Sequence, residues 1–162
     1  KAKGAYVYTT TSTDNVAWVK ALGADTVIDY KKEDYKNIAK DVDIVFDTLG
    51  KNYALDAFEV VKQGGIVVSV VGPIDEETAK IFGMSDYKLP EDLSKASNDK
   101  NAQYTFIFMH PNGSHLSQIK LMIEDELIKP IIDKVYPFSE GIQAFTHLAS
   151  GRAKGKIVVK IN

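Results

Sequence analysis

The stretch VDIVFDTLGKNYALDAFEVVKQGGIVVSVV, residues 42–71, decides the fold. It opens with residues 42–47, an apolar run that is typical of a strand inside a sheet. Residues 53–62 follow with apolar side chains at helical spacing, and the pair Gly64-Gly65 is expected to end that helix. Residues 66–71 are nearly all β-branched and apolar, which predicts a strand covered on both faces. A strand, a helix and a strand in this order predict two parallel strands joined by a right-handed crossover.

The same alternation continues toward the N-terminus. Strands are expected at 6–10 and 26–29, with a helix between them that Thr13 caps and Gly23 ends. A short polar helix is expected at 33–40. We therefore predict an α/β fold with a doubly wound, parallel, Rossmann-type sheet.

The alternation is interrupted after the decisive stretch. Residues 73–103 form a long polar segment that is expected to hold one short helix. A further strand is expected at 104–108, and Asn112 is expected to cap a helix that ends before Pro130. The last part of the chain is predicted to form a strand, a helix and a strand, at 135–138, 139–150 and 156–161.

Composition excludes several classes of function. The 162 residues carry a net charge of -2, which gives no electrostatic footprint for nucleic acid or an anionic membrane. The chain has no cysteine, so it has no disulfide, no thiolate nucleophile and no cysteine-ligated zinc. His110 and His115 are not at the spacing that places two metal ligands on one helix face. We predict a cytoplasmic protein with no metal site and no catalytic residue of its own.

Ligands of open parallel sheets bind where the strands end, so these ends are the candidate site. They form a rim of hydroxyls and small residues, which suits a dinucleotide whose phosphates and riboses bind hydroxyls and backbone amides. Tyr30 can flank the adenine, and the small Gly72 leaves room for the nicotinamide. The rim consists of Thr10-Thr11-Ser12, Asp29-Tyr30, Asp47-Thr48-Leu49-Gly50, Val71-Gly72 and Phe108-Met109.

The end of the first strand bears on the choice of cofactor. An NAD-preferring fold usually places Asp or Glu there, whereas residues 10–13 are all Thr or Ser. Hydroxyls and a helix turn can donate to a 2′-phosphate that a carboxylate would repel, which favours NADP. Asp14 and the lack of a cation between Thr9 and Val19 argue the other way, and the hydroxyls also suit a purely capping role.

Asp47 allows other interpretations. An aspartate at a strand end could accept a phosphoryl group, as in a receiver domain, but that site needs further acidic residues after the first strand and a lysine after the fifth. Thr10-Thr11 and Val71-Gly72 stand there instead. The residues give even less support to a site that binds a methyl donor. The structural alternative is that the carboxylate of Asp47 binds the turn from Thr48 to Gly50.

Six segments, spread in order along the chain, carry a resemblance to a known family: TTSTDN at 10–15, VKALGADTVIDY at 19–30, VFDTLG at 45–50, GGIVVSVVG at 64–72, FMHPNG at 108–113 and SGRAKGKIV at 150–158. They resemble the C-terminal half of medium-chain dehydrogenase/reductases, in the zinc-independent branch of quinone oxidoreductases and enone reductases. The resemblance implies hydride transfer from NADP(H), with NAD(H) as a possible substitute, to a quinone or an α,β-unsaturated carbonyl compound.

The resemblance also implies roles for particular residues. Ser12, Thr13 and Asn15 would meet the 2′-phosphate, and Tyr30 would line the adenine-ribose pocket. The pyrophosphate and nicotinamide side would comprise Asp47, Thr48, Leu49, Gly50, Val71, Gly72, Phe108 and Met109, with Lys154 and Gly155 closing over the cofactor. Strand 104–108 would pair with that of a second copy in a homodimer.

In this family a glycine-rich loop and a catalytic domain would precede residue 1. Residues 1–126 are therefore expected to be a partial dinucleotide-binding domain, and residues 127–162 a return segment of a GroES-like catalytic domain. Without the loop, several amide contacts of about 1.5–3 kcal/mol each are lost, which would weaken binding about 10³-fold and leave the fragment inactive. A relative of zinc-dependent alcohol dehydrogenases and a non-enzymatic nucleotide-binding or interaction module are the alternatives.

Overall fold

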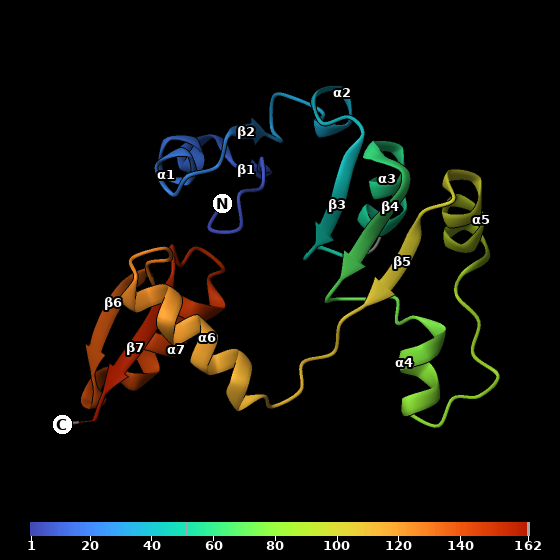
Figure 1. Ribbon diagram of the computed structural model, residues 1–162. Coiled ribbons are helices and arrows are strands. Elements are labelled where there is room, and N and C mark those ends of the chain that lie inside the picture. Colours follow the sequence, from blue (N-terminus) through green and yellow to red (C-terminus); the bar gives the residue numbers. More distant parts are fainter. Residues whose placement is uncertain (51, 162) are drawn as a thin grey trace. The chain divides into compact units, whose positions relative to one another are not determined.

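The structure of the protein, a computed structural model, describes residues 1–50 and 52–161 (Figure 1). Strands and helices alternate, and all paired strands run parallel, which confirms the predicted α/β class. The strands form three sheets, ordered β1-β2, β3-β4-β5 and β6-β7. The chain divides into two compact units, Lys3–His110 and a second that begins at Pro111, whereas the sequence-based division lies at residue 126.

The first unit begins with a two-stranded sheet. Its elements are β1 (Tyr8–Thr11), the 3-10 helix η1 (Thr13–Asn15), α1 (Val16–Ala21), β2 (Thr26–Asp29) and α2 (Tyr35–Ile38). Gly23 follows α1 as predicted, with φ +103° and its amide donating to the carbonyl of Lys20. Thr11 lies opposite Asp29, so the two strands end at the same edge.

The second sheet of this unit holds the main hydrophobic core. Its elements are β3 (Val42–Asp47), α3 (Tyr53–Val60), β4 (Val61–Ser69), α4 (Glu76–Ile81), α5 (Glu91–Lys100) and β5 (Gln103–Phe106). α3 and α5 pack against each other and against β4 (Figure 1). Phe58 from α3, Val67 from β4 and Leu93 from α5 meet in this core. Burial of these side chains holds β4 at the centre of the sheet.

The prediction that residues 42–47 lie inside a sheet differs from the structure. Within the described part of the chain, β3 pairs with β4 alone and is an edge strand. Val45 packs on the core, while Ile44 and Phe46 are exposed. Because side chains alternate along a strand, Ile44 and Phe46 face the opposite side of the sheet.

The predicted helix stop at Gly64-Gly65 is wrong. α3 ends at Val60, and both glycines lie within β4. The pairing with β3 shifts in register here, and a Cβ on Gly65 would come within 2.8 Å of the carbonyl oxygen of Asp43. Gly65 is therefore required by the close approach of two strand backbones, and not by a helix end.

The prediction of one short helix in residues 73–103 is also wrong, because two helices form. α4 is capped by Asp75, and α5 ends at Asn101 with φ +47°. The sequence of α5 is polar, with Leu93 as its one buried residue. One apolar anchor is too little to produce the helical periodicity on which the prediction depended.

The second unit contains α6 (Gly113–Glu124), β6 (Ile132–Pro137), the 3-10 helix η2 (Phe138–Glu140), α7 (Gly141–Ala149) and β7 (Lys156–Lys160). Asn112 caps α6 as predicted, since its Oδ1 accepts from the amide of His115 at 3.0 Å. Phe138 and Phe145 are largely exposed, as are Val135 and Ile161. Assignment of this unit to a catalytic domain stays a prediction.

Candidate functional site

Four of the predicted cofactor residues lie together where β1 and β2 end. Ser12 and Thr13 follow β1, and Tyr30 follows β2 with its amide donating to the carbonyl of Thr11 at 3.1 Å. Asn15 turns back on this segment, because its amide donates to the carbonyl of Ser12 at 2.9 Å. The structure thus groups the residues predicted for the adenosine side, and their binding of a cofactor stays a prediction.

The side-chain amide of Asn15 is the feature of this cluster that fits a ligand. Its Nδ2 donates to Ser12 Oγ at 3.3 Å. Its Oδ1 is buried and has no hydrogen-bond partner within residues 1–50 and 52–161. An unpaired buried polar group costs about 1–3 kcal/mol, so a ligand that pairs with it gains affinity. The amide can present its oxygen or its NH₂ group, which suits a ribose hydroxyl or a phosphate.

Thr13 does not cap a helix as predicted. Its Oγ1 donates to Asp29 Oδ2 at 2.7 Å, and the preceding Ser12 makes no side-chain capping bond. The hydrogen bond from Thr13 lowers the pKa of the nearly buried Asp29 carboxyl group, and Lys32 Nζ lies 3.4 Å from the same oxygen. The hydroxyl of Thr13 is therefore engaged by a carboxylate whose charge Lys32 offsets.

A second cluster lies where β3 and β4 end. Asp47 is 5% exposed, and its Oδ1 accepts from the amides of Leu49 and Gly50 at 2.9 and 3.0 Å. Its Oδ2 accepts from the buried hydroxyl of Ser69 at 3.0 Å. Oδ1 thus holds the turn that includes Thr48 and Oδ2 binds β4, which agrees with the structural interpretation of Asp47.

The same cluster brings two predicted backbone segments into contact. Gly50 has φ +69°, and a Cβ there would meet Val71 Cγ2 at 3.1 Å. The amides of Val71 and Gly72 point to Ser69 Oγ at 3.3 and 3.2 Å, and Gly72 has φ +99°. Gly50 and Gly72 therefore give this edge backbone that carries no side chain of its own. A cofactor that contacts the backbone needs such bare positions.

The predicted nicotinamide-side residues Phe108 and Met109 lie beyond the sheet. β5 ends at Phe106, two residues before the predicted strand end. The ring of Phe108 packs edge-on against Phe82, with the ring centroids 5.2 Å apart. About half of the Phe108 side chain and most of Met109 remain exposed at this edge.

Lys154 and Gly155 lie in the second unit, in the turn before β7. The amide of Lys154 donates to Asp133 Oδ2 at 3.1 Å. His147 Nε2 lies 3.3 Å from the same oxygen, and His147 Nδ1 bonds the hydroxyl of Tyr136 at 3.1 Å. The bond from Lys154 to Asp133 holds this turn beside β6, and the predicted role of Lys154 and Gly155 at the cofactor stays a prediction.

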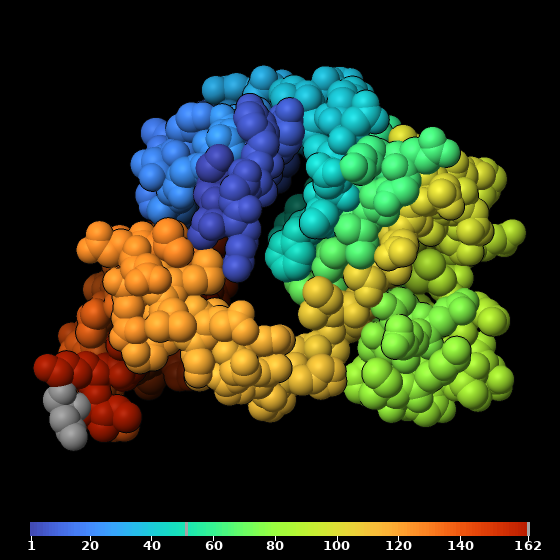
Figure 2. Space-filling view, in the orientation of Figure 1, coloured from blue at the N-terminus to red at the C-terminus, as the bar shows by residue number. Residues whose placement is uncertain are grey.

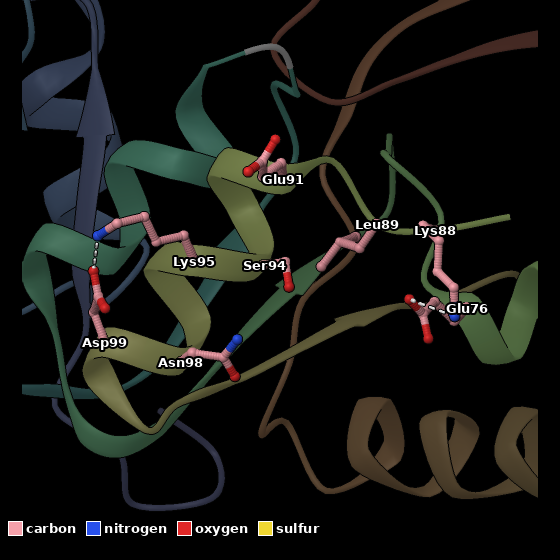
Figure 3. A pocket seen from close by; sticks show the side chains of 8 residues that line it. All are labelled: Glu76, Lys88, Leu89, Glu91, Ser94, Lys95, Asn98 and Asp99. Atoms are coloured by element: carbon pink, nitrogen blue, oxygen red, sulfur yellow. Dashed lines mark hydrogen bonds and ion pairs between the residues drawn. The ribbon is translucent and has the colours of Figure 1, made fainter.

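Two hollows occur in the first unit. The larger, of about 550 Å³, is lined by residues between Glu76 and Asp99, and no predicted cofactor residue is among them. Figure 3 shows two ion pairs among its side chains, Lys95 with Asp99 and Lys88 with Glu76. The smaller hollow, of about 260 Å³, lies between α4 and the end of β5 and includes Phe108.

Three residues with clear structural roles at these sites escaped the sequence-based prediction. Asp75 precedes acidic residues at a helix start, a pattern that could have indicated its capping role. The bonds of Ser69 to Asp47 and of Asp133 to Lys154 carry no such local signal, because these partners lie 22 and 21 residues away.

Metal ligands and membrane-spanning helices bear on the class of the protein. Within 1–50 and 52–161, no group of three His, Cys, Asp or Glu side chains is placed to hold a metal ion. In the same part of the chain, no helix combines the length and apolar character that crossing a bilayer requires. The predicted absence of a metal site and the predicted cytoplasmic location both stay predictions.

Comparison with known proteins agrees with the fold. The 2-methylene-furan-3-one reductase of Solanum lycopersicum is 31% identical over 155 residues, which are 94% of this chain and 33% of that protein. The NADPH-dependent alkenal/one oxidoreductase of Arabidopsis thaliana is 30% identical over the same shares. The quinone oxidoreductase structure from Coxiella burnetii superposes with a TM-score of 0.76 at 26% identity, over 99% of this chain and 46% of that one.

The chain thus spans between a third and a half of the length of these relatives. A family model described as zinc-binding dehydrogenase matches residues 22–159, which is most of the chain. The predicted resemblance to medium-chain dehydrogenase/reductases is confirmed by this match and these relatives. The chain belongs to the zinc-binding dehydrogenase family.

Proposed function

We propose that this chain is the cofactor-binding part of an NADP(H)-dependent reductase of quinones or α,β-unsaturated carbonyl compounds. The observation that carries the proposal is that 94% of the chain aligns with two plant proteins. One is named a 2-methylene-furan-3-one reductase and the other an NADPH-dependent alkenal/one oxidoreductase. The similar quinone oxidoreductase structure supports the same reaction class.

The chemistry that bound NADPH supplies is hydride donation: the substrate gains a hydride and a proton, and NADP⁺ results together with a saturated carbonyl compound from an enone or a hydroquinone from a quinone. The residues of this chain would bind and orient the cofactor. Asn15, Ser12 and Tyr30 would hold the adenosine side at the end of β1 and β2. Gly50 and Gly72 would admit the pyrophosphate and nicotinamide ribose at the end of β3 and β4.

A preference for NADP(H) is supported by the end of β1, where Ser12 and Asn15 offer uncharged donors. Asp29 is nearby, but the hydroxyl of Thr13 and the ammonium of Lys32 both face its Oδ2. Lys31 and Lys32 also place two cations just after β2. A 2′-phosphate would therefore meet donors and cations, which outweigh one neutralised carboxylate.

A homodimer through strand 104–108 is part of the proposal. β5 lies at the edge of its sheet, as edge-to-edge pairing requires. The amide of Phe106, however, donates to Asp75 Oδ2 at 2.8 Å and is not free to pair with another strand. Pairing would therefore use the part of β5 before Phe106, and sedimentation of the chain at rising concentration would measure it.

The cofactor proposal can be tested on the adenosine half of the ligand. We expect 2′,5′-ADP to shift the backbone NMR signals of Ser12, Asn15 and Tyr30 at lower concentration than 5′-AMP does. Asn15→Ala should weaken the 2′,5′-ADP response, while Asn98→Ala on α5 should not. Equal responses to both nucleotides would contradict the NADP preference, and shifts elsewhere in the chain would contradict the site.

A further inference from the structure

The smaller hollow is built by a helix that is fixed to the sheet edge. Asp75 Oδ1 accepts from the amide of Thr78 at 2.7 Å and so caps α4. Asp75 Oδ2 accepts from the amide of Phe106 and the hydroxyl of Thr105 at 2.8 and 3.1 Å. In Figure 2 the green atoms of α4 lie beside the yellow atoms at the end of β5. The helix is thus held at the edge where β4 and β5 end.

A further hydrogen bond holds the segment that leads into α4. The hydroxyl of Tyr104 donates to the carbonyl of Pro73 at 2.5 Å. Burial raises the pKa of Tyr104 to about 12, so this hydroxyl keeps its proton at neutral pH. Pro73 directly follows Gly72, a predicted cofactor residue. The candidate cofactor edge and the hollow are therefore joined by one restrained stretch of chain.

The walls of the hollow are in part apolar and aromatic, and Asp75, Glu77, Thr78, Thr105 and His110 also line it. Phe82 from the end of α4 meets Phe108 edge-on, and the Phe108 ring lies 5.9 Å from that of His110. Phe82 and Phe108 are 50% and 51% exposed, and both line the hollow. Ile81 and Ile107 line the same space. Apolar surface in a concave site gains free energy when a ligand covers it.

The charge and the volume of the hollow limit the kinds of ligand that it can bind. Among the described residues 1–50 and 52–161, Asp75 and Glu77 are the charged ones that line the hollow, and no Lys or Arg of these ranges lines it. An anionic ligand would be repelled there, whereas a neutral one would not. The volume of about 260 Å³ is below the roughly 300–1,000 Å³ typical of sites that enclose a drug-sized ligand. The hollow therefore suits the apolar end of a small, neutral molecule.

We propose that the hollow between α4 and the end of β5 binds the apolar body of a neutral carbonyl substrate, with Phe82 as a specificity-determining residue. This inference rests on the proposed function for the identity of the ligand as a substrate. It adds that neutral enones or quinones with a hydrocarbon body are preferred over carboxylates and over acyl groups carried on phosphates. Phe108 would link this site to the nicotinamide side.

The test uses 2-heptanone, a saturated ketone that lacks the activated C=C bond to which nucleophilic side chains add, and heptanoate as its anionic counterpart. We expect 2-heptanone to shift the NMR signals of Phe82, Ile107 and Phe108 in the isotope-labelled chain, without any nucleotide present. Heptanoate at pH 7 should produce much weaker shifts at these residues. Equal binding of the two probes, or shifts that lie outside the hollow, would overturn the proposal.

Variants sharpen the test. Phe82→Ala should weaken 2-heptanone binding about fivefold, since half of a phenylalanine surface is lost. Phe82→Leu should retain most of the affinity, and Phe138→Ala, at an exposed phenylalanine of the second unit, should change nothing. An unaltered affinity of Phe82→Ala would contradict the role of Phe82. Because the ketone is added without nucleotide, failure of 2′,5′-ADP binding would overturn only the cofactor site.

Discussion

The hydroxyl of Thr13 donates to the carboxylate of Asp29 across 2.7 Å, between residues 16 apart in the chain. This bond ties the turn after β1 to the end of β2. It also assigns the hydroxyl to a protein partner at a place where the sequence indicates a cap or a phosphate contact. At the ends of β1 and β2, where the adenosine half of the cofactor is predicted to bind, Ser12, Asn15 and the lysines after β2 are therefore the residues that would contact it.

Replacing Thr13 tests this link directly. In Thr13→Val, we expect the pKa of Asp29 to rise toward its ordinary value of 3.8, because its main stabilising hydrogen bond is lost. The pKa is measured from the carboxyl ¹³C shift of Asp29 as pH is varied. In the native chain, the lowered pKa stabilises the fold above about pH 4, and this contribution disappears as pH falls through the folded-state value. Thr10→Val serves as control, and an unchanged pKa in Thr13→Val would refute the link.

The buried hydroxyl of Ser69 is expected to stabilise the β3–β4 edge. Ser69→Ala removes the donor to Asp47 Oδ2 and the acceptor for the amide of Gly72. Partners left unsatisfied in a buried site should lower the free energy of unfolding by about 1–3 kcal/mol. Urea unfolding followed by the fluorescence of Trp18, the one tryptophan of the chain, measures the change. Ser94→Ala on α5 should change stability little, and an equal loss in both variants would count against this role.

Asp75 should make the stability of the first unit depend on acid. Burial raises its pKa, but bonds from the amides of Phe106 and Thr78 outweigh burial and the pKa is lowered overall. Its contribution is therefore full above the unfolded-state value of about 3.9 and is lost as pH falls through the folded-state pKa. Asp75→Ala should cost about 1–2 kcal/mol at pH 7 and progressively less below pH 4.

The measurement is urea unfolding of Asp75→Ala at several values between pH 3 and pH 7. Asp86→Ala, at an exposed aspartate of the same segment, is the control. A loss of stability that stays constant over this whole range would show that the charge of Asp75 contributes nothing.

Gly155 should be intolerant of a side chain. It has φ +134°, and a Cβ would come within 2.5 Å of the carbonyl oxygen of Ile131. Gly155→Ala should therefore destabilise the β6–β7 pair by more than about 1 kcal/mol. Gly141→Ala is the matched control, because nothing lies within 4 Å of its added Cβ. Faster amide exchange at Val158 in Gly155→Ala alone is expected, and equal exchange in both variants would contradict the prediction.

The order of elements and the parallel class were predictable from the sequence. Apolar runs such as 66–71 are local patterns, and the structure has a strand, β4, over most of that run, while the helix stop at Gly64-Gly65 and the single helix in 73–103 were predicted wrongly. Local signals also predicted the end of α1 at Gly23 and the cap of α6 at Asn112. The role of Asp47 in its turn was one of the alternatives, because its partners lie two and three residues away.

Tertiary structure alone decided the links that shape the candidate sites. Thr13 meets Asp29, Asp75 meets Phe106, and Asp133 meets Lys154 over separations of 16, 31 and 21 residues. The need for glycine at position 65 also arises from tertiary structure, because the backbone of β3 lies too close to leave room for a Cβ. The physical reason is that periodicity and capping depend on neighbours within about one helical turn. Hydrogen bonds and close backbone contacts between distant segments exist only once packing has brought those segments together.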